Sequence, residues 1–316
     1  PVLRDVSLSV KARSAIGLAG HGGPNTVIVW QEEAGTWTTS TALTDRLSPE
    51  VNAYVKAHPI LSAKGQPWDR LLPEESYLFA DRAPAEPADA VFPHLLEEPI
   101  RTARITQTFV DLWSRTPFVD AFLGDLAGTL VDQLKLGQRQ ATDVLAVSFS
   151  GLDLVGHPYG PRSHEVQDTL ARLDQTIGKL IAVLDRAVGR DRYVLALSAD
   201  HGVATLPEQA EPWMDAGRMN TLLPVGTAID AVLDKALGKG SYVEAISGTY
   251  LYLRPGVLDR IKSSPTVLKE IAAAAQGIRG IANVYWSMDL EATTPTSDPI
   301  LARLRRSHMA GRSGDL

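Results

Sequence analysis

The chain has 316 residues, 44% of them hydrophobic and 22% charged, a composition typical of a globular protein with a large core in one elaborate domain or two. Its formal net charge of -6 argues against a nucleic-acid partner, because binding to phosphate backbones needs clustered Lys and Arg. The sequence has no apolar run long enough for a membrane span. It also has no cysteine, which excludes disulfides, cysteine-ligated zinc and thiol catalysis.

The first part of the chain is expected to contain short strands and helices. Short apolar or β-branched runs bounded by turn residues predict strands, and Gly35 lies in the turn between the second and third, which predicts a hairpin. Ser48 and Pro49 are typical of an N-cap and a first helical residue. Residues 59–100, rich in Pro, Glu and Asp, predict a long surface loop. The expected elements are strands at 15–20, 26–31 and 36–41 and helices at 48–58 and 117–136.

The middle of the chain predicts a strand–helix–strand unit. Residues 143–150 are apolar enough for a strand buried on both faces. Ser163 can cap a long amphipathic helix that ends at Gly189, and residues 193–199 are the expected second strand. Such units normally give parallel pairing with a right-handed crossover. Functional residues in such a sheet follow the carboxyl ends of the strands.

The sequence pattern changes after Pro207, so we expect a second region. Residues 215–290 predict two helices, near 226–237 and 256–275, alternating with strands at 249–254 and 282–287. We therefore expect three segments: a core at 1–210, an α+β cap or insertion at 211–290, and a short basic helix within 291–316 that returns to the core.

Two pairs of carboxylate and imidazole follow the two strands of the middle unit. Asp153 and His157 lie in SGLDLVGH, and Asp200 and His201 lie in LSADHG. Asp oxygen and His nitrogen are zinc ligands, and the glycine beside each pair gives the backbone freedom to bring both side chains to one ion. Either pair alone is more simply explained by turn capping. Both pairs, after consecutive strands, favour half of a two-metal hydrolase site.

Other histidines carry weaker signals. His164, near the start of the long helix, is expected to be solvated, with a place behind the metal loop as the alternative. His58 and His94 lie in loop-like surroundings without an evident partner. No Gly-x-Ser-x-Gly motif occurs, which argues against a Ser–His–Asp esterase.

The segments SFSGLDLVGHPYGPRSHEVQDTLARLDQ and VLALSADHGVATLPE resemble the alkaline phosphatase superfamily. They are most similar to phosphate-irrepressible (PafA-type) alkaline phosphatases and to their phosphodiesterase and nucleotide pyrophosphatase relatives. The resemblance implies an α/β fold with a mostly parallel sheet, helices on both faces and a small α+β cap. It also implies an exported enzyme, periplasmic or secreted, that acts on small phosphate esters with two zinc ions. We expect a monomer.

The same resemblance assigns roles to six residues. Asp153 and His157 would bind the first zinc, and Asp200 and His201 the second, although other divalent ions are compatible with these ligands. Lys11 and Arg13 match a K-x-R motif whose two side chains reach the transferred phosphoryl group. In an extended segment residues i and i+2 project to the same side, which suits two cations facing a phosphate monoester dianion. Without the resemblance, a solvated K-x-R on a surface strand would be the simpler explanation.

The sequence also departs from the family pattern. The family's Thr or Ser nucleophile, with an Asp ligand, precedes the K-x-R motif, and its last His ligand follows an R-S-G-D segment. The contexts of Ser7, Ser9 and Ser14 do not match the nucleophile's strand–loop–helix turn. We therefore expect an internal fragment with little or no phosphatase activity, derived from a zinc-dependent monoesterase that uses a covalent phospho-Thr or phospho-Ser intermediate. The alternatives are a phosphodiesterase or nucleotide pyrophosphatase of the same superfamily and a catalytically dead relative.

Overall fold

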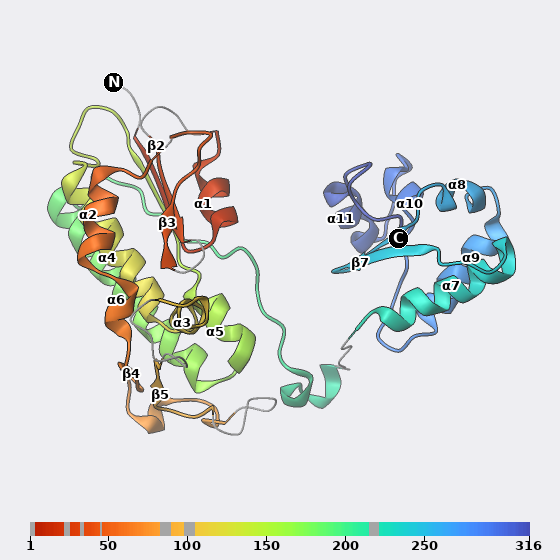
Figure 1. Cartoon of the computed structure of the whole chain (residues 1–316), viewed down its shortest axis with the longest axis horizontal. Coiled ribbons are helices and arrows are strands. Elements are labelled where there is room, and N and C mark those ends of the chain that lie inside the picture. The colour runs from red at the N-terminus through yellow and green to blue at the C-terminus, as the bar shows by residue number, and fades with distance from the viewer. Residues whose placement is uncertain are drawn as a thin grey trace. The chain divides into compact units, whose positions relative to one another are not determined.

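The computed structural model describes residues 4–21, 26–31, 35–44, 46–82, 90–97, 105–214 and 221–316. It divides into two compact units, residues 1–209 and 210–316, each described here by itself (Figure 1). The helices and strands of the first unit are β1 (Asp5–Ser9), α1 (Ala12–Ala19), β2 (Thr26–Gln31), β3 (Trp37–Thr38), α2 (Pro49–Ala57), β4 (Pro67–Trp68), β5 (His94–Leu95), α3 (Gln107–Ser114), α4 (Phe118–Gln133), β6 (Val144–Ser148), α5 (Gly151–Tyr159) and α6 (His164–Ala187).

The main sheet of the first unit has the strand order β3-β2-β1-β6. Strand β1 pairs in parallel with both β2 and β6, whereas β3 pairs antiparallel with β2. This confirms the expected mostly parallel sheet. The hairpin around Gly35 is also confirmed, although β3 has two residues instead of the six expected, and Gly35 takes the positive φ of 74° that a tight turn favours.

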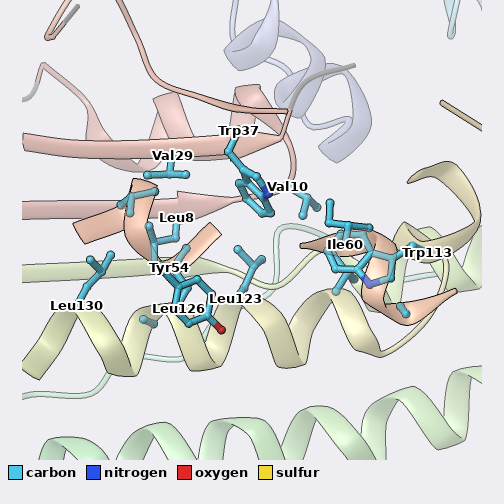
Figure 2. Packing of buried hydrophobic residues seen from close by; sticks show 14 of the residues in the cluster. Leu8, Val10, Val29, Trp37, Tyr54, Ile60, Trp113, Leu123, Leu126 and Leu130 are labelled. Atoms are coloured by element: carbon cyan, nitrogen blue, oxygen red, sulfur yellow. The ribbon is translucent and has the colours of Figure 1, made fainter. Parts of the chain in front are cut away.

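Helices cover both faces of this sheet because alternate strand residues point in opposite directions. On one face Leu8 of β1 and Val29 of β2 pack in the main core with Leu126 of α4 (Figure 2). On the other face Ile28 packs in a cluster with Ala15 of α1. These two layers bring the carboxyl ends of β1 and β6 to the edge from which α1 and α5 begin.

The expected strand at 15–20 is wrong, because this segment lies in helix α1. A short apolar run does not by itself distinguish a strand from a buried helix. Ala15 and Ala19 lie one helical turn apart and are both buried, and their small side chains let α1 lie close to the sheet. Gly20, with a φ of 57°, ends the helix.

The strand–helix–strand unit forms only in part. Strand β6 and helix α6 are present, and Ser163 caps α6 by accepting from the backbone N of Val166 at 3.2 Å. Residues 193–199 are not in a strand, and Val194 is 96% exposed. A strand needs a neighbour to satisfy its backbone, and none of the described strands pairs with this segment. Accordingly β6 is partly exposed instead of buried on both faces.

The second unit has an α+β composition, with elements α7 (Leu223–Leu237), β7 (Val243–Ser247), β8 (Tyr250–Leu253), α8 (Val257–Ile261), α9 (Pro265–Gln276), α10 (Ser287–Glu291) and α11 (Pro299–Ser307). Strands β7 and β8 form an antiparallel pair. The helix expected at 256–275 is two helices separated before Pro265. The strand expected at 282–287 is wrong, because residues 281–286 lie in neither helix nor strand and α10 begins at Ser287. Strand β7 was not anticipated.

The end of the chain also belongs to the second unit. The backbone N of Leu251 donates to the carbonyl of Leu316 at 2.9 Å, and the backbone N of Leu253 donates to Oδ2 of Asp315 at 2.7 Å. The structure therefore divides at residue 209, one residue before the expected boundary, and makes no division at residue 290. The return of residues 291–316 to the core stays a prediction.

None of the described helices has the length and apolar character that a membrane crossing requires.

Candidate functional site

Asp153 and His157 lie on helix α5 and not in a flexible loop as the sequence suggested. They are four residues apart, so both side chains project from the same face of the helix. His157 Nε2 lies 3.6 Å from Asp153 Oδ1. The first pair is therefore preorganised by regular secondary structure, even though the His157 side chain is 75% exposed.

Asp200 and His201 lie in the segment without helix or strand that follows residues 193–199. The backbone N of His201 donates to Asp200 Oδ1 at 3.1 Å, and the His201 ring atom Nδ1 lies 2.9 Å from the carbonyl of Gly202. Its other ring nitrogen, Nε2, lies 3.7 Å from Asp200 Oδ2 and 3.8 Å from Asp153 Oδ1. The two motifs, 43 or more residues apart in sequence, thus meet at one carboxylate oxygen.

Lys11 joins the same carboxylate from the end of β1. Its Nζ lies 2.5 Å from Asp153 Oδ2. The hydrogen bond from Lys11, with the charges of Lys11, His157 and His201, holds the pKa of Asp153 below its usual value against the opposing effect of partial burial. Asp153 therefore remains an anion that faces one ammonium and two imidazoles.

Arg13 does not share this arrangement. The expected extended segment is absent: Lys11 is the N-cap of α1 and Arg13 is its second residue. Helical residues two apart are rotated by about 200°, so they do not share a face. Arg13 is exposed, and within the described part of the chain no hydrogen bond or ion pair is formed by its side chain. The structure thus brings Lys11, and not Arg13, to Asp153.

The donor set suits zinc. Two ligands of a tetrahedral zinc ion, each about 2.1 Å from the metal, lie about 3.4 Å apart. The separations of 3.6 Å to His157 and 3.8 Å to His201 from Asp153 Oδ1 are close to that value. Across the described residues, no three His, Asp or Glu side chains are grouped to hold one ion on their own. Each ion would therefore need ligands in addition to one Asp–His pair.

A cavity of about 670 Å³ opens beside Lys11 at the carboxyl ends of β1 and β2. Its wall includes the apolar side chains of Trp30 and Leu154 and the polar side chains of Gln31 and Asp111. A volume of this size accommodates a small organic group. The cavity can therefore hold a small organic group next to the side chain of Lys11.

Ser7 and Ser9, the two serines of β1, are not exposed to a substrate. Ser7 and Ser9 on β1 are both fully buried. Ser7 Oγ donates to the carbonyl of Ala15 at 2.6 Å, and Ser9 Oγ accepts from the backbone N of Lys11 at 3.0 Å. Both hydroxyls thus form hydrogen bonds that connect β1 to α1. This agrees with the sequence analysis, in which neither serine matches the surroundings of the family's nucleophile.

Comparisons with known proteins match this chain to phosphodiesterases and alkaline phosphatases. The family model for type I phosphodiesterases and nucleotide pyrophosphatases matches residues 26–316. Alkaline phosphatase PhoV of Synechococcus elongatus is 32% identical over 234 residues, which are 72% of this chain and 41% of PhoV. Alkaline phosphatase PafA of Elizabethkingia meningoseptica is 31% identical over 206 residues, 63% of this chain and 37% of PafA.

A solved structure agrees with the sequence matches. The crystal structure of wild-type alkaline phosphatase PafA superposes with a TM-score of 0.76 at 27% identity, covering 99% of this chain and 60% of that one. The chain spans about two fifths of the length of PhoV and of PafA, the two curated relatives named above. This similarity confirms the expected α/β fold, and it extends through both units of the chain.

Proposed function

Because this chain belongs to the type I phosphodiesterase and nucleotide pyrophosphatase family, within the alkaline phosphatase superfamily, we propose that the protein takes part in zinc-dependent hydrolysis of phosphate monoesters. The observation that carries the proposal is the convergence of Lys11, His157 and His201 on the carboxylate of Asp153. Such a cluster gathers cation-binding groups and one cation at the carboxyl edge of a parallel sheet, where α/β proteins bind their ligands.

In this proposal Asp153 with His157 holds one zinc ion, and Asp200 with His201 holds a second. Bound zinc ions supply positive charge that stabilises the negative charge developing on phosphoryl and leaving-group oxygens. The ammonium of Lys11 binds a phosphoryl oxygen and orients the ester, whose alcohol portion lies in the adjacent cavity. The family resemblance also assigns Arg13 to this phosphoryl group, although it lies on another face of α1 from Lys11.

We propose a covalent route for the intact enzyme. The oxygen of a Thr or Ser hydroxyl outside this chain forms a bond to phosphorus while the bond from phosphorus to the ester oxygen breaks, and the departing alkoxide takes up a proton. Water then releases inorganic phosphate and restores the hydroxyl. This assignment is supported by the burial of Ser7 and Ser9, which leaves neither in reach of a substrate.

Ligand binding by the 316-residue chain tests the proposal without requiring turnover. We would load the chain with zinc, measure the bound metal, and titrate methyl phosphate and dimethyl phosphate by calorimetry. We expect methyl phosphate to bind at least about tenfold more tightly, because it carries one more negative charge near Lys11 and the metal ions. We also expect a chelator to abolish binding. Absence of bound zinc, or equal affinity for the two esters, would overturn the proposal.

A phosphodiesterase is the second candidate, and one observation favours it. A phosphate diester carries one negative charge fewer than a monoester and so needs fewer cations around it. In the structure Lys11 contacts Asp153, whereas Arg13 does not. Substitution Arg13→Glu distinguishes the two candidates: it should weaken methyl phosphate binding in a monoesterase and leave dimethyl phosphate binding unchanged. The third possibility, a catalytically dead relative, predicts no turnover of p-nitrophenyl phosphate even by a longer protein that carries the nucleophile.

We propose that the enzyme is exported to the periplasm or secreted and acts as a monomer on small phosphate esters. Export is supported by its kinship with alkaline phosphatases. Cell fractionation tests the location, and sedimentation velocity tests the monomeric state.

A further inference from the structure

Asp120 of α4 is a buried carboxylate next to the beginning of α5. It is 1% exposed, and its Oδ1 accepts a hydrogen bond from the backbone N of Gly151 at 3.0 Å. Burial raises the pKa of Asp120 to about 6, although hydrogen bonds from the backbone of Gly151, Leu152 and Ser150 oppose that rise. Its other oxygen, Oδ2, is buried without a hydrogen-bond partner among the described residues.

The carboxylate replaces a local cap of α5. The first backbone N–H groups of a helix need acceptors, which the N-cap side chain commonly supplies. Ser150 occupies the N-cap of α5 but makes no side-chain cap hydrogen bond. Its Oγ lies instead 3.5 Å from Ser9 Oγ at the end of β1. Asp120 therefore caps α5 from a different helix, at the stability cost of burying a charge with no cation bonded to it among the described residues.

This cap is directly connected to the candidate site. Asp153 is the third residue of α5, and its carboxylate meets Lys11 and His201. The backbone N of Lys11 donates to Ser9 Oγ at 3.0 Å, the same hydroxyl that lies near Ser150. The starts of α1 and α5 are thus connected to one another through buried hydroxyls, and to α4 through Asp120.

Gly151 makes this arrangement sterically possible. A Cβ atom at position 151 would lie 2.5 Å from Asp120 Oδ2 and 2.9 Å from Val119 Cγ1, closer than real Cβ contacts allow. The carboxylate therefore lies directly against the backbone of the first turn, and a small displacement of Asp120 would displace that turn.

We propose that Asp120 is a positioning residue of the phosphate-ester site. It fixes the first turn of α5 so that Asp153 and His157 keep their orientation toward Lys11 and His201. This inference rests on the proposed function, because the groups that it positions are the proposed zinc ligands. Burying this carboxylate lowers folding stability, and we explain its presence by the precise placement that it gives to the residues of the site.

Three variants of the 316-residue chain test the inference: Asp120→Asn, Asp120→Ser, and Asp125→Asn as a matched control. Asp125 lies on the same helix and is exposed. We would measure zinc affinity by calorimetry, amide exchange of residues 150–159 in the zinc-free chain, and the melting temperature at neutral pH. For Asp120→Asn we expect zinc affinity to fall about 10- to 100-fold, as for other residues that orient ligands. We also expect faster exchange in α5 and a melting temperature equal to or above that of the wild type.

A residue with a merely structural role gives a different pattern. If zinc affinity falls only in proportion to a lower melting temperature, Asp120 is structural and the inference is wrong. If the wild type binds zinc and Asp120→Asn binds it within twofold, the inference fails while the proposed function stands. If the wild-type chain binds no zinc, the proposed metal site fails and the inference fails with it. Asp120→Ser, with a short hydroxyl acceptor, replaces Asp120→Asn in each comparison if the latter does not fold.

Discussion

The two halves of the candidate site are held in very different ways. Asp153 and His157 lie on a regular helix whose residues Gly151 and Val155 are buried and whose first turn is capped by Asp120. Asp200 and His201 follow a segment that is neither helix nor strand and in which Val194 is 96% exposed. The first half is preorganised by packing. The second half is held mainly by local hydrogen bonds and by its approach to Asp153. Regular secondary structure therefore fixes only one of the two proposed ligand pairs.

The largest effect is expected from Asp153→Ala. Both imidazoles lie near Asp153 Oδ1, so this substitution should weaken binding of both zinc ions by more than about a hundredfold, beyond the usual effect of changing an orienting residue. Asp200→Ala should release one ion and leave the other bound to α5. Metal content after dialysis distinguishes these outcomes, with Asp125→Ala as control. Equal losses in the two variants would show that the halves are not organised differently.

The pH dependence of stability tests the packed half. Burial raises the pKa of Asp120 from 3.8 to about 6, so the folded state retains this proton to higher pH than the unfolded state. The resulting stabilisation is full below pH 3.8 and is lost as the pH rises through about 6, a change of about 3 kcal/mol. As the pH rises, the free energy of unfolding of the wild type should fall by this amount relative to that of Asp120→Asn. Urea unfolding at a series of pH values measures the difference. A constant difference across the series would contradict the assignment.

A pair of glycine substitutions tests how tightly the first turn of α5 is packed. Gly151→Ala should lower the free energy of unfolding by about 2 kcal/mol, because the new methyl group would overlap Asp120 and Val119. Gly178→Ala is the matched control on α6: its Cβ meets no atom within 4 Å, and alanine favours helices by up to about 1 kcal/mol. Thermal unfolding measures both. Gly151→Ala as stable as the control would mean that the carboxylate is not confined.

The smallest expected effect concerns the half of the site that contains Asp200 and His201. Zinc binding should slow amide exchange in residues 193–203 by about tenfold, equivalent to about 1.4 kcal/mol of local stabilisation, and should change α5 much less. Exchange measured with and without zinc checks this difference. Equal protection of both segments would show that Asp200 and His201 are as preorganised as the pair on α5.

Helix α6 shows how far sequence patterns reach. Its bounds follow from Ser163 and Gly189, which act locally. Its orientation follows only in part: Leu180 and Leu184 pack against the main core, but the most deeply buried residues of α6 are polar and Leu170 is 49% exposed. His164, expected to be solvated, is 3% exposed, and its Nε2 donates a hydrogen bond to the carbonyl oxygen of Phe79 at 2.6 Å. Periodicity identifies a helix, whereas its buried face depends on neighbours distant in sequence.

The surroundings of His94 also depend on residues that are distant in sequence. No sequence signal pairs it with Glu165, yet His94 Nε2 lies 2.8 Å from the fully buried carboxylate of Glu165. Asp120 likewise lacks a sequence signature, since it lies 31 residues before the backbone group that it binds. Such long-range polar contacts form only after helices and loops have packed together, so a single sequence does not reveal them.

The sequence by itself determined the residue types and the local signals of this protein. The motifs around Asp153 and Asp200 supplied the family resemblance and residue types able to bind a metal, and Ser48 with Pro49 set the start of α2. The tertiary structure decided that residues 15–19 form part of a helix, that residues 193–199 pair with none of the described strands, and that both imidazoles meet at Asp153. Caps and motifs depend on neighbouring residues, whereas strand pairing and convergence of side chains depend on contacts between distant parts of the chain.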